Sequence, residues 1–254
     1  MKILLTNDDG YTAPGILALH QTLKPHHEVT LVAPDRENSG VGHAISLNQP
    51  MRLEEKALPC GSPAFAVTGT PADCVKLALF ELFPGEAVPD LVIAGINPGS
   101  NTGVNINYSG TAAAAREAVI NGVPAIAASI EIGARQCLDF EGFAQFIATL
   151  VDKLPGMGIP GGTFLNLNAP DRMIHEARGV AITRQCTGNV SKEFSKRTDP
   201  KNREYFWYGG AYVPEGETDT DIQAVGRDRI SISPIQCDTT DHDSLDSLRV
   251  LESS

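Results

Sequence analysis

Short apolar runs in this chain alternate with longer segments whose apolar residues recur at helical spacing. The apolar runs predict buried strands over residues 2–6, 28–33, 90–97, 124–130, 163–168 and 229–235. The helical spacing predicts helices over 15–24, 70–83, 109–121 and 139–153, and a short helix after Asp241. Strands that alternate with helices pair in parallel through right-handed crossovers, so we expect an α/β fold with a mostly parallel sheet.

Two segments depart from this alternation. Residues 45–69 alternate only loosely and predict a β excursion. Residues 186–228 are polar, apart from an aromatic cluster at 205–208, and predict an extended C-terminal β arm. The arm has too little apolar sequence to fold alone, so we expect one domain, with a core over about 1–185 plus 229–254. We also expect the arm to be used in oligomerisation.

Composition narrows the class of protein. The 254 residues carry a net charge of −11, which argues against a protein that binds a nucleic acid duplex by neutralising its phosphates. No apolar run is long enough to span a membrane, and the N-terminus has no apolar region typical of a signal peptide. The five cysteines are odd in number and form no CxxC pair. They are typical of reduced thiols, so we expect a cytoplasmic protein with no membrane partner.

Two adjacent carboxylates, Asp8 and Asp9, follow the first predicted strand. Ligands in open α/β sheets bind beyond the carboxyl ends of the strands, where this pair should lie. Like charges side by side are costly unless a cation lies between them, and hard divalent cations take carboxylate oxygens as ligands. The alternative is a structural turn, because Asp-Gly is a common turn dipeptide and Asp is a good helix N-cap.

Two further loops should reach the same edge of the sheet. Ser39 and Gly40 follow the strand at 28–33, and Asn97 ends the strand at 90–97. These loops offer oxygen ligands and contain no His or Cys at zinc-like spacing. The sequence therefore predicts Mg²⁺ or Mn²⁺, although Asn97 alone would more often be an ordinary turn residue.

A candidate anion site follows Asn97. Residues Ser109, Gly110 and Thr111 open a helix whose first N–H groups are unpaired, and the helix dipole adds positive charge there. The equal alternative is that Ser109 or Thr111 only caps the helix. Asn101 and Asn105 could let the backbone approach a phosphate, or could merely shape a tight loop.

Other chemistries have no support in the sequence. It contains no GxSxG, HExxH, GxxxxGK[ST] or GxGxxG motif. His43 follows Ser39 by four residues and either points near the site or is an ordinary surface histidine.

Together these motifs resemble those of the SurE family of survival-protein nucleotidases. The matching segments are MKILLTNDDGYTAPGI, APDRENSG, VIAGINPGSN, YSGTAAAAREA and the late DTDIQAV with ISISPI. They extend over essentially the whole chain. The sequence departs from the family near Asn105, where an Asp would be expected.

The resemblance implies a fold, an activity and a site. The family has a Rossmann-like core, and its members exchange the arm between subunits in homodimers or homotetramers. The implied activity is that of a 5′-nucleotidase, an acid-type phosphatase that depends on one Mg²⁺ or Mn²⁺ per subunit. It releases phosphate from nucleoside 5′- and 3′-monophosphates, and in some members from short polyphosphate. The implied metal ligands are Asp8, Asp9, Ser39 and Asn97, and the residues facing phosphate are Asn101, Ser109, Gly110 and Thr111.

Our hypothesis is therefore metal-assisted hydrolysis of a phosphomonoester, with Asp8 and Asp9 as the catalytic residues. A nucleoside hydrolase that binds Ca²⁺ is a rival, but it would need a denser Asp cluster than this chain has. A metal-dependent nucleotide sensor is a second rival. The products separate the three: free phosphate, free base, or neither.

Overall fold

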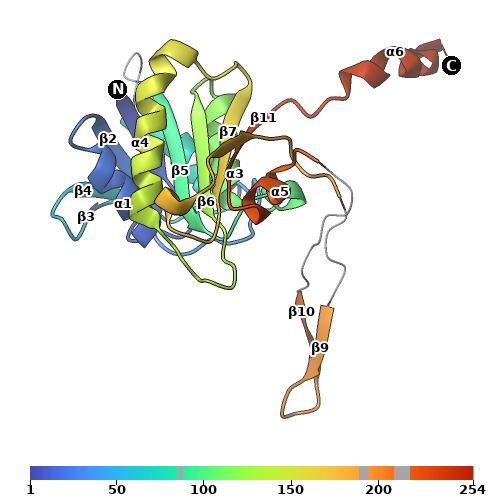
Figure 1. Cartoon of the computed structure of the whole chain (residues 1–254), viewed down its shortest axis with the longest axis horizontal. Coiled ribbons are helices and arrows are strands. Elements are labelled where there is room, and N and C mark those ends of the chain that lie inside the picture. Colours follow the sequence, from blue (N-terminus) through green and yellow to red (C-terminus); the bar gives the residue numbers. More distant parts are fainter. Residues whose placement is uncertain (84, 86–87, 189–193, 209–217, 254) are drawn as a thin grey trace.

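The computed structural model describes residues 1–83, 85, 88–188, 194–208 and 218–253 (Figure 1). In this part of the chain nine strands form one sheet in the order β3-β4-β2-β1-β5-β6-β7-β11-β8. The strands are β1 (Lys2–Thr6), β2 (Glu28–Pro34), β3 (Leu53–Ala57), β4 (Pro63–Val67), β5 (Leu91–Pro98), β6 (Ala125–Ile130), β7 (Thr163–Ala169), β8 (Val180–Ile182) and β11 (Ile230–Gln236). The helices are α1 (Pro14–Leu23), α2 (Pro71–Leu77), α3 (Gly110–Ile120), α4 (Phe140–Met157), α5 (Asp221–Gly226) and α6 (Leu245–Leu248).

The centre of the sheet is parallel, as predicted. Strand β1 pairs in parallel with both β2 and β5, and β6 joins β5 to β7 in the same direction. Antiparallel pairing occurs at β3 with β4 and at β11 with β7. Because β2, β1 and β5 are parallel neighbours, the loops after them open at one edge of the sheet. This confirms the mostly parallel α/β fold.

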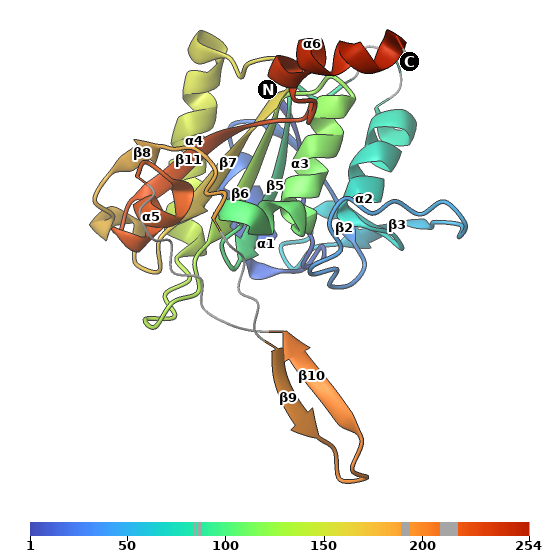
Figure 2. The same cartoon turned by 90° about the vertical axis from the view of Figure 1, so that its right-hand side faces the viewer.

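Helices cover both faces of the sheet (Figure 2). Adjacent strand residues face opposite sides, so Leu5 packs in the cluster with α1 and α4, whereas Leu4 packs in the cluster with α2 and α3. The alanines on the inner face of α3 are almost fully buried. Their small side chains allow the helix to approach the sheet closely, which brings its first turn to the edge of β1.

One detail differs from the expected elements. Strand β4 lies within the predicted excursion at 45–69, yet it joins the main sheet beside β2, because its residues Ala64, Ala66 and Val67 supply a buried apolar edge. The predicted start of the helix at Thr70 is confirmed. Thr70 and Asp73 exchange side-chain to backbone hydrogen bonds of 2.9 and 3.1 Å in a capping box.

The predicted arm contains a hairpin of β9 (Phe194–Thr198) and β10 (Glu204–Tyr208), which lies away from the sheet (Figures 1 and 2). However, α5 also falls within the predicted 186–228 and packs on the core with Ala224 and Val225 buried. The side chain of Asp221 holds it there by accepting hydrogen bonds from the backbone of Gly103 and Cys186. Residues 189–193 and 209–217 of the predicted arm lie outside the described residues.

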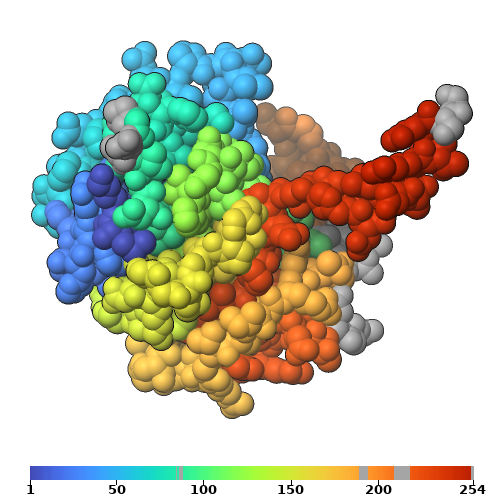
Figure 3. Space-filling view, turned by 90° about the horizontal axis from the view of Figure 1, so that it is seen from above, coloured from blue at the N-terminus to red at the C-terminus, as the bar shows by residue number. Residues whose placement is uncertain are grey.

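The C-terminal segment with α6 extends away from the body of the molecule (Figure 3). Its exposed side chains include Leu245 and Leu248. All five cysteines are free thiols. Within the described ranges, no helix combines the length and the apolar character that crossing a membrane would require.

Candidate functional site

The turn after β1 is closed by an asparagine rather than by the two carboxylates. The side chain of Asn7 accepts a hydrogen bond from the Gly10 backbone at 3.1 Å and donates one to the Gly10 carbonyl at 2.9 Å. Helix α1 begins after Ala13 and has no side-chain cap. Asp8 and Asp9 therefore do not serve as helix caps, and the structural-turn alternative accounts for Asn7 and Gly10 only.

Asp8 lies against the first turn of α3. The residue is 4% exposed, and its Oδ1 accepts a hydrogen bond of 2.5 Å from the hydroxyl of Thr111. Burial raises the pKa of Asp8, while the hydrogen bonds from Thr111 and nearby backbone groups oppose that rise. The first turn of α3 thus supplies hydrogen-bond donors that favour the ionised form of the buried Asp8 carboxylate, which is the form that binds a metal.

Asp9 has the less favourable electrostatic surroundings of the two carboxylates. Burial, together with the charges of Asp8 and Glu37, raises the pKa of Asp9 to about 7. Its Oδ2 is buried and has no hydrogen-bond partner among the described residues. An unpaired buried carboxylate oxygen is costly, and a bound cation would remove that cost.

The loops after β2 and β5 approach the same place. The backbone N–H of Asn38 donates to the carbonyl of Asp8 at 2.7 Å, which ties the Ser39 loop to the carboxylate turn. Ser39 is exposed and its hydroxyl donates to Glu37 at 2.7 Å. The amide nitrogen of Asn97 donates to the Gly99 carbonyl at 2.5 Å, which leaves the amide oxygen as the atom that could bind a metal.

These donors fit a hard divalent cation. Two carboxylates and neutral oxygens from a hydroxyl and an amide match the preferences of Mg²⁺ or Mn²⁺. In the part of the chain that the structure describes, no three His, Cys, Asp or Glu side chains form a cluster that could hold a metal. Any ion here would therefore depend on the neutral oxygens and on water as well as on the two carboxylates.

A cavity of about 640 Å³ brings together five of the eight predicted site residues. Those five are Asp8, Ser39, Asn97, Asn101 and Ser109, and the other lining residues include Pro98, Ser100, Asn105, Tyr108 and Tyr208. Asp9 lines an adjoining cavity of about 270 Å³ with Glu37. Pro98 lines both cavities, so the two cavities adjoin at this residue.

The three residues of the predicted anion site at the start of α3 have two different roles. Ser109 caps the helix, since its hydroxyl accepts from the Ala112 N–H at 3.0 Å, and it also lines the cavity. Gly110 and Thr111 do not line it and instead contact Asp8. A Cβ added to Gly110 would lie 2.8 Å from the Cβ of Asp8, so only glycine permits this approach.

Asn101 is buried between strands while it lines the cavity. Its amide nitrogen donates to the Ser129 hydroxyl at 2.8 Å, and its backbone N–H donates to Asn168 at 2.8 Å. The amide of Asn166 donates to its carbonyl at 2.9 Å. Polar side chains on β6 and β7 therefore hold the loop after β5 in place, which the sequence pattern had not indicated.

His43 does not line the cavity. Its Nε2 lies 2.8 Å from Oε2 of Glu117 on α3, and Lys76 and Asn121 bind the other carboxylate oxygen at 2.8 and 2.9 Å. The hydrogen bond from His43, followed by those from Lys76 and Asn121, outweighs burial and lowers the pKa of Glu117 to about 2. His43 thus fastens the Ser39 loop to α3.

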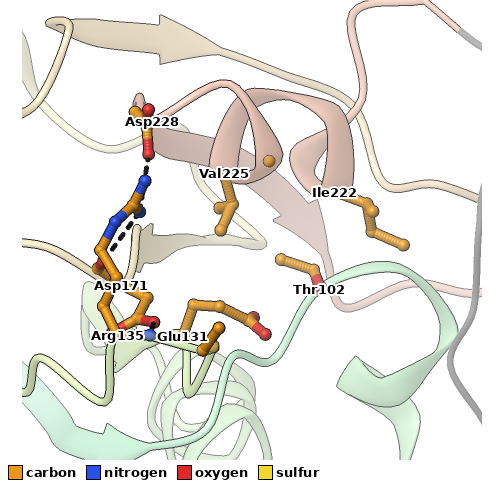
Figure 4. A pocket seen from close by; sticks show the side chains of 10 residues that line it. Thr102, Glu131, Arg135, Asp171, Ile222, Val225 and Asp228 are labelled. Carbon is orange, nitrogen blue, oxygen red and sulfur yellow. Dashed lines mark hydrogen bonds and ion pairs between the residues drawn. The ribbon is translucent and has the colours of Figure 1, made fainter.

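A separate cavity of about 450 Å³ is lined by Thr102 and by residues of the loops that follow β6 and β7 and of α5 (Figure 4). Its charged residues are already partnered: Arg135 lies 3.3 Å from Asp228, and Asp171 accepts backbone hydrogen bonds from the loop at residues 135–137. Glu131 in this cavity accepts a hydrogen bond from Ser100, which lines the first one. The carboxylates of this second cavity therefore bind and support loops. The candidate active site is the first cavity, which contains Asp8.

Sequence reasoning missed the two tyrosines that line the site cavity. Tyr108 precedes the Ser109 cap, and Tyr208 ends β10. The aromatic cluster at 205–208 was the available signal, but nothing in the local pattern connects the hairpin with the loops of the sheet.

Comparisons with known proteins find relatives over nearly the whole chain. A family model described as Survival protein SurE matches residues 3–192. The chain is 46% identical over 252 residues to a protein named 5′-nucleotidase SurE from Desulfatibacillum aliphaticivorans, covering 98% of this chain and 97% of that one. A protein of the same name from Geobacter sulfurreducens is 43% identical over 250 residues, covering 98% and 93%.

A solved structure has the same fold. The crystal structure of the SurE protein from Aquifex aeolicus superimposes with a TM-score of 0.84 at 37% sequence identity, covering 99% of this chain and 100% of that one. The similarity therefore extends over nearly the whole of both chains.

Proposed function

This chain belongs to the SurE family, and we propose that it is a nucleotidase. In this proposal it is a metal-dependent phosphomonoesterase that hydrolyses nucleoside 5′- and 3′-monophosphates to nucleoside and phosphate. Release of phosphate from short polyphosphate is proposed as a secondary activity. The observation that carries the proposal is the buried, unpartnered Oδ2 of Asp9 beside Asp8.

The proposed ligands of one Mg²⁺ or Mn²⁺ per subunit are Asp8, Asp9, Ser39 and Asn97. Such an ion, when bound, polarises a phosphoryl oxygen and makes an attacking water more acidic. Asp8 is held by Thr111, so its carboxylate stays oriented toward the cavity during turnover. One of the two carboxylates, Asp8 or Asp9, is also proposed to orient or deprotonate the attacking water.

The proposed phosphate site lies at the first turn of α3. Ser109 caps this helix and faces the cavity, where the positive end of the helix dipole favours an anion. Asn101 lines the same wall and is proposed to donate to the equatorial oxygens as their charge develops. Gly110 and Thr111 support the site through Asp8. No side chain is assigned as the general acid, and water is proposed to protonate the leaving alkoxide.

The test is phosphate release from 5′-AMP, 3′-AMP and tripolyphosphate by protein stripped with EDTA, before and after adding Mn²⁺ or Mg²⁺. Restoration of phosphate release by metal is the expected result, and the three rates rank the substrates. Free adenine in place of phosphate would favour the nucleoside hydrolase. Tight binding of AMP with no product under either metal would favour the sensor.

The arm is proposed to join subunits in a homodimer or homotetramer. The hairpin exposes Phe194, Phe206 and Trp207, each more than half accessible to solvent. Apolar surface of this kind away from the core is typical of a contact with another chain. Light scattering should show a lower mass when Phe206 and Trp207 are both changed to Ser. Leu47→Ser, at a 79% exposed position outside the arm, is the control. An unchanged mass would show that the arm does not hold subunits together.

A further inference from the structure

The site cavity is larger than a phosphate requires. Its volume of about 640 Å³ lies in the range of sites that enclose a whole small molecule. The lining residues differ strongly in depth. Asp8 and Ser109 are 4% and 6% exposed, whereas Tyr108 and Tyr208 are 56% and 60% exposed. A phosphate held by the buried residues would therefore direct the rest of the substrate toward the two tyrosines.

The outer part of the cavity has the chemistry of a nucleobase site. Asp8 is the one charged residue among the described residues that line it, and it lies at the floor. The rim presents two aromatic rings and the amide of Asn105. Aromatic faces stack on any planar base, and an amide can pair with its polar edge.

The ring of Tyr208 is supported by its own hairpin. Tyr208 pairs with Phe194 across the two strands, and their rings make an edge-to-face contact at 5.4 Å. Strand residues alternate between faces, so Tyr205 lies on the opposite face of β10 from Tyr208. The same strand therefore offers an internal control that has the same side chain and does not line the cavity.

We propose that Tyr208, with Tyr108 beside the phosphate site, receives the nucleobase of the substrate and makes the enzyme selective for nucleotides over simple phosphate esters. This inference rests on the proposed nucleotidase function and deepens it. The hairpin then has a role in substrate recognition in addition to any contact between subunits.

The experiment compares 5′-AMP with ribose 5-phosphate, which keeps the phosphoester and lacks the base. Wild type, Tyr208→Ala, Tyr208→Phe and Tyr205→Ala are assayed with Mn²⁺. Tyr208→Ala should lose at least about fivefold in kcat/KM for AMP, the lower end of what a base–aromatic stack contributes. The loss should appear in KM rather than in kcat, because stacking on the base binds ground state and transition state alike.

The other combinations of variant and substrate should give turnover close to that of wild type. Ribose 5-phosphate turnover by Tyr208→Ala should change by less than about twofold, and Tyr208→Phe should retain AMP turnover because its ring still stacks. Tyr205→Ala should behave as wild type on both substrates. Light scattering and circular dichroism establish that every variant keeps the wild-type mass and fold.

Two results would overturn the inference. Equal losses on both substrates would mean that Tyr208 acts only through the structure of the hairpin, and undiminished AMP turnover would mean that the base does not contact it. A wild type that hydrolyses neither substrate would contradict the proposed function instead. Equilibrium dialysis of AMP and ribose 5-phosphate with wild type and Tyr208→Ala then decides the inference, because base stacking must weaken AMP binding alone.

Discussion

The hydroxyl of Thr111 donates a hydrogen bond of 2.5 Å to Oδ1 of Asp8 across 103 positions of sequence. This contact joins the turn after the first strand to the first turn of α3. It brings a candidate metal ligand next to the candidate phosphate site.

Removing this hydroxyl should impair turnover while the fold is kept. Thr111→Val leaves one oxygen of buried Asp8 without its donor, and a hydrogen bond to a charged group contributes about 1.5–3 kcal/mol. We expect phosphate release to fall by at least about tenfold. Thr111→Ser retains the hydroxyl and should retain most of the activity. Equal activity of the Val and Ser variants would show that the hydrogen bond does not orient Asp8 for turnover.

Neutralising Asp8 should abolish turnover without unfolding the protein. Asp8→Asn removes the charge that would hold the metal, so we expect phosphate release to fall by at least about 100-fold. Burial raises the folded pKa of Asp8, so its contribution to stability is present below pH 3.8 and is lost as pH rises through the raised value. The neutral amide avoids this loss, and the melting temperature of the metal-free variant at pH 7 should equal or exceed that of wild type.

Two glycine-to-alanine substitutions test whether the close approach of α3 to Asp8 requires a glycine. Gly110→Ala places a Cβ 2.8 Å from the Cβ of Asp8, and we expect it to cost about 1–3 kcal/mol of unfolding free energy and most of the activity. Gly156→Ala, in α4, meets nothing within 4 Å and should be neutral or slightly stabilising. Urea denaturation and phosphate release measure both effects. A tolerated Gly110→Ala would mean that α3 can move away from Asp8 at no cost.

The Glu117 network should give the stability of the protein an acid dependence. The folded pKa of about 2 lies below the ordinary 4.5, so this stabilisation is present above pH 4.5 and is lost as pH falls through about 2. At most it amounts to about 3 kcal/mol. Because Lys76 is 48% exposed, solvent screening should reduce the measured value.

Urea denaturation of wild type and Glu117→Gln at several pH values measures this contribution. The difference in unfolding free energy between the two should be largest above pH 4.5 and should shrink toward pH 2. Glu141→Gln, at an exposed position on α4, is the control. A difference that does not change with pH would show that Glu117 contributes by packing alone.

Local patterns predicted most of the secondary structure. The apolar run of β1, the turn residues that follow it and the cap at Thr70 all depend on neighbours within a few positions, and each is where the pattern predicts. The arm was predicted too long because the packing of α5 depends on Asp221 contacting Gly103, which lies 118 positions away. Strand β8 was missed because three residues carry no periodicity that a pattern can detect.

The candidate site also combines features that local sequence patterns predict with contacts between residues far apart in the chain. Carboxylate and neutral oxygen side chains follow β1, β2 and β5 in the sequence, and the parallel pairing that the pattern predicts places their loops at one edge of the sheet. The folded chain alone shows that Thr111 binds Asp8, that His43 binds Glu117, and that Tyr208 lines the site cavity. Those contacts depend on how closely a helix packs on the sheet and where a hairpin lies. Such distances are set by the packing of the whole core, and no short stretch of sequence contains them.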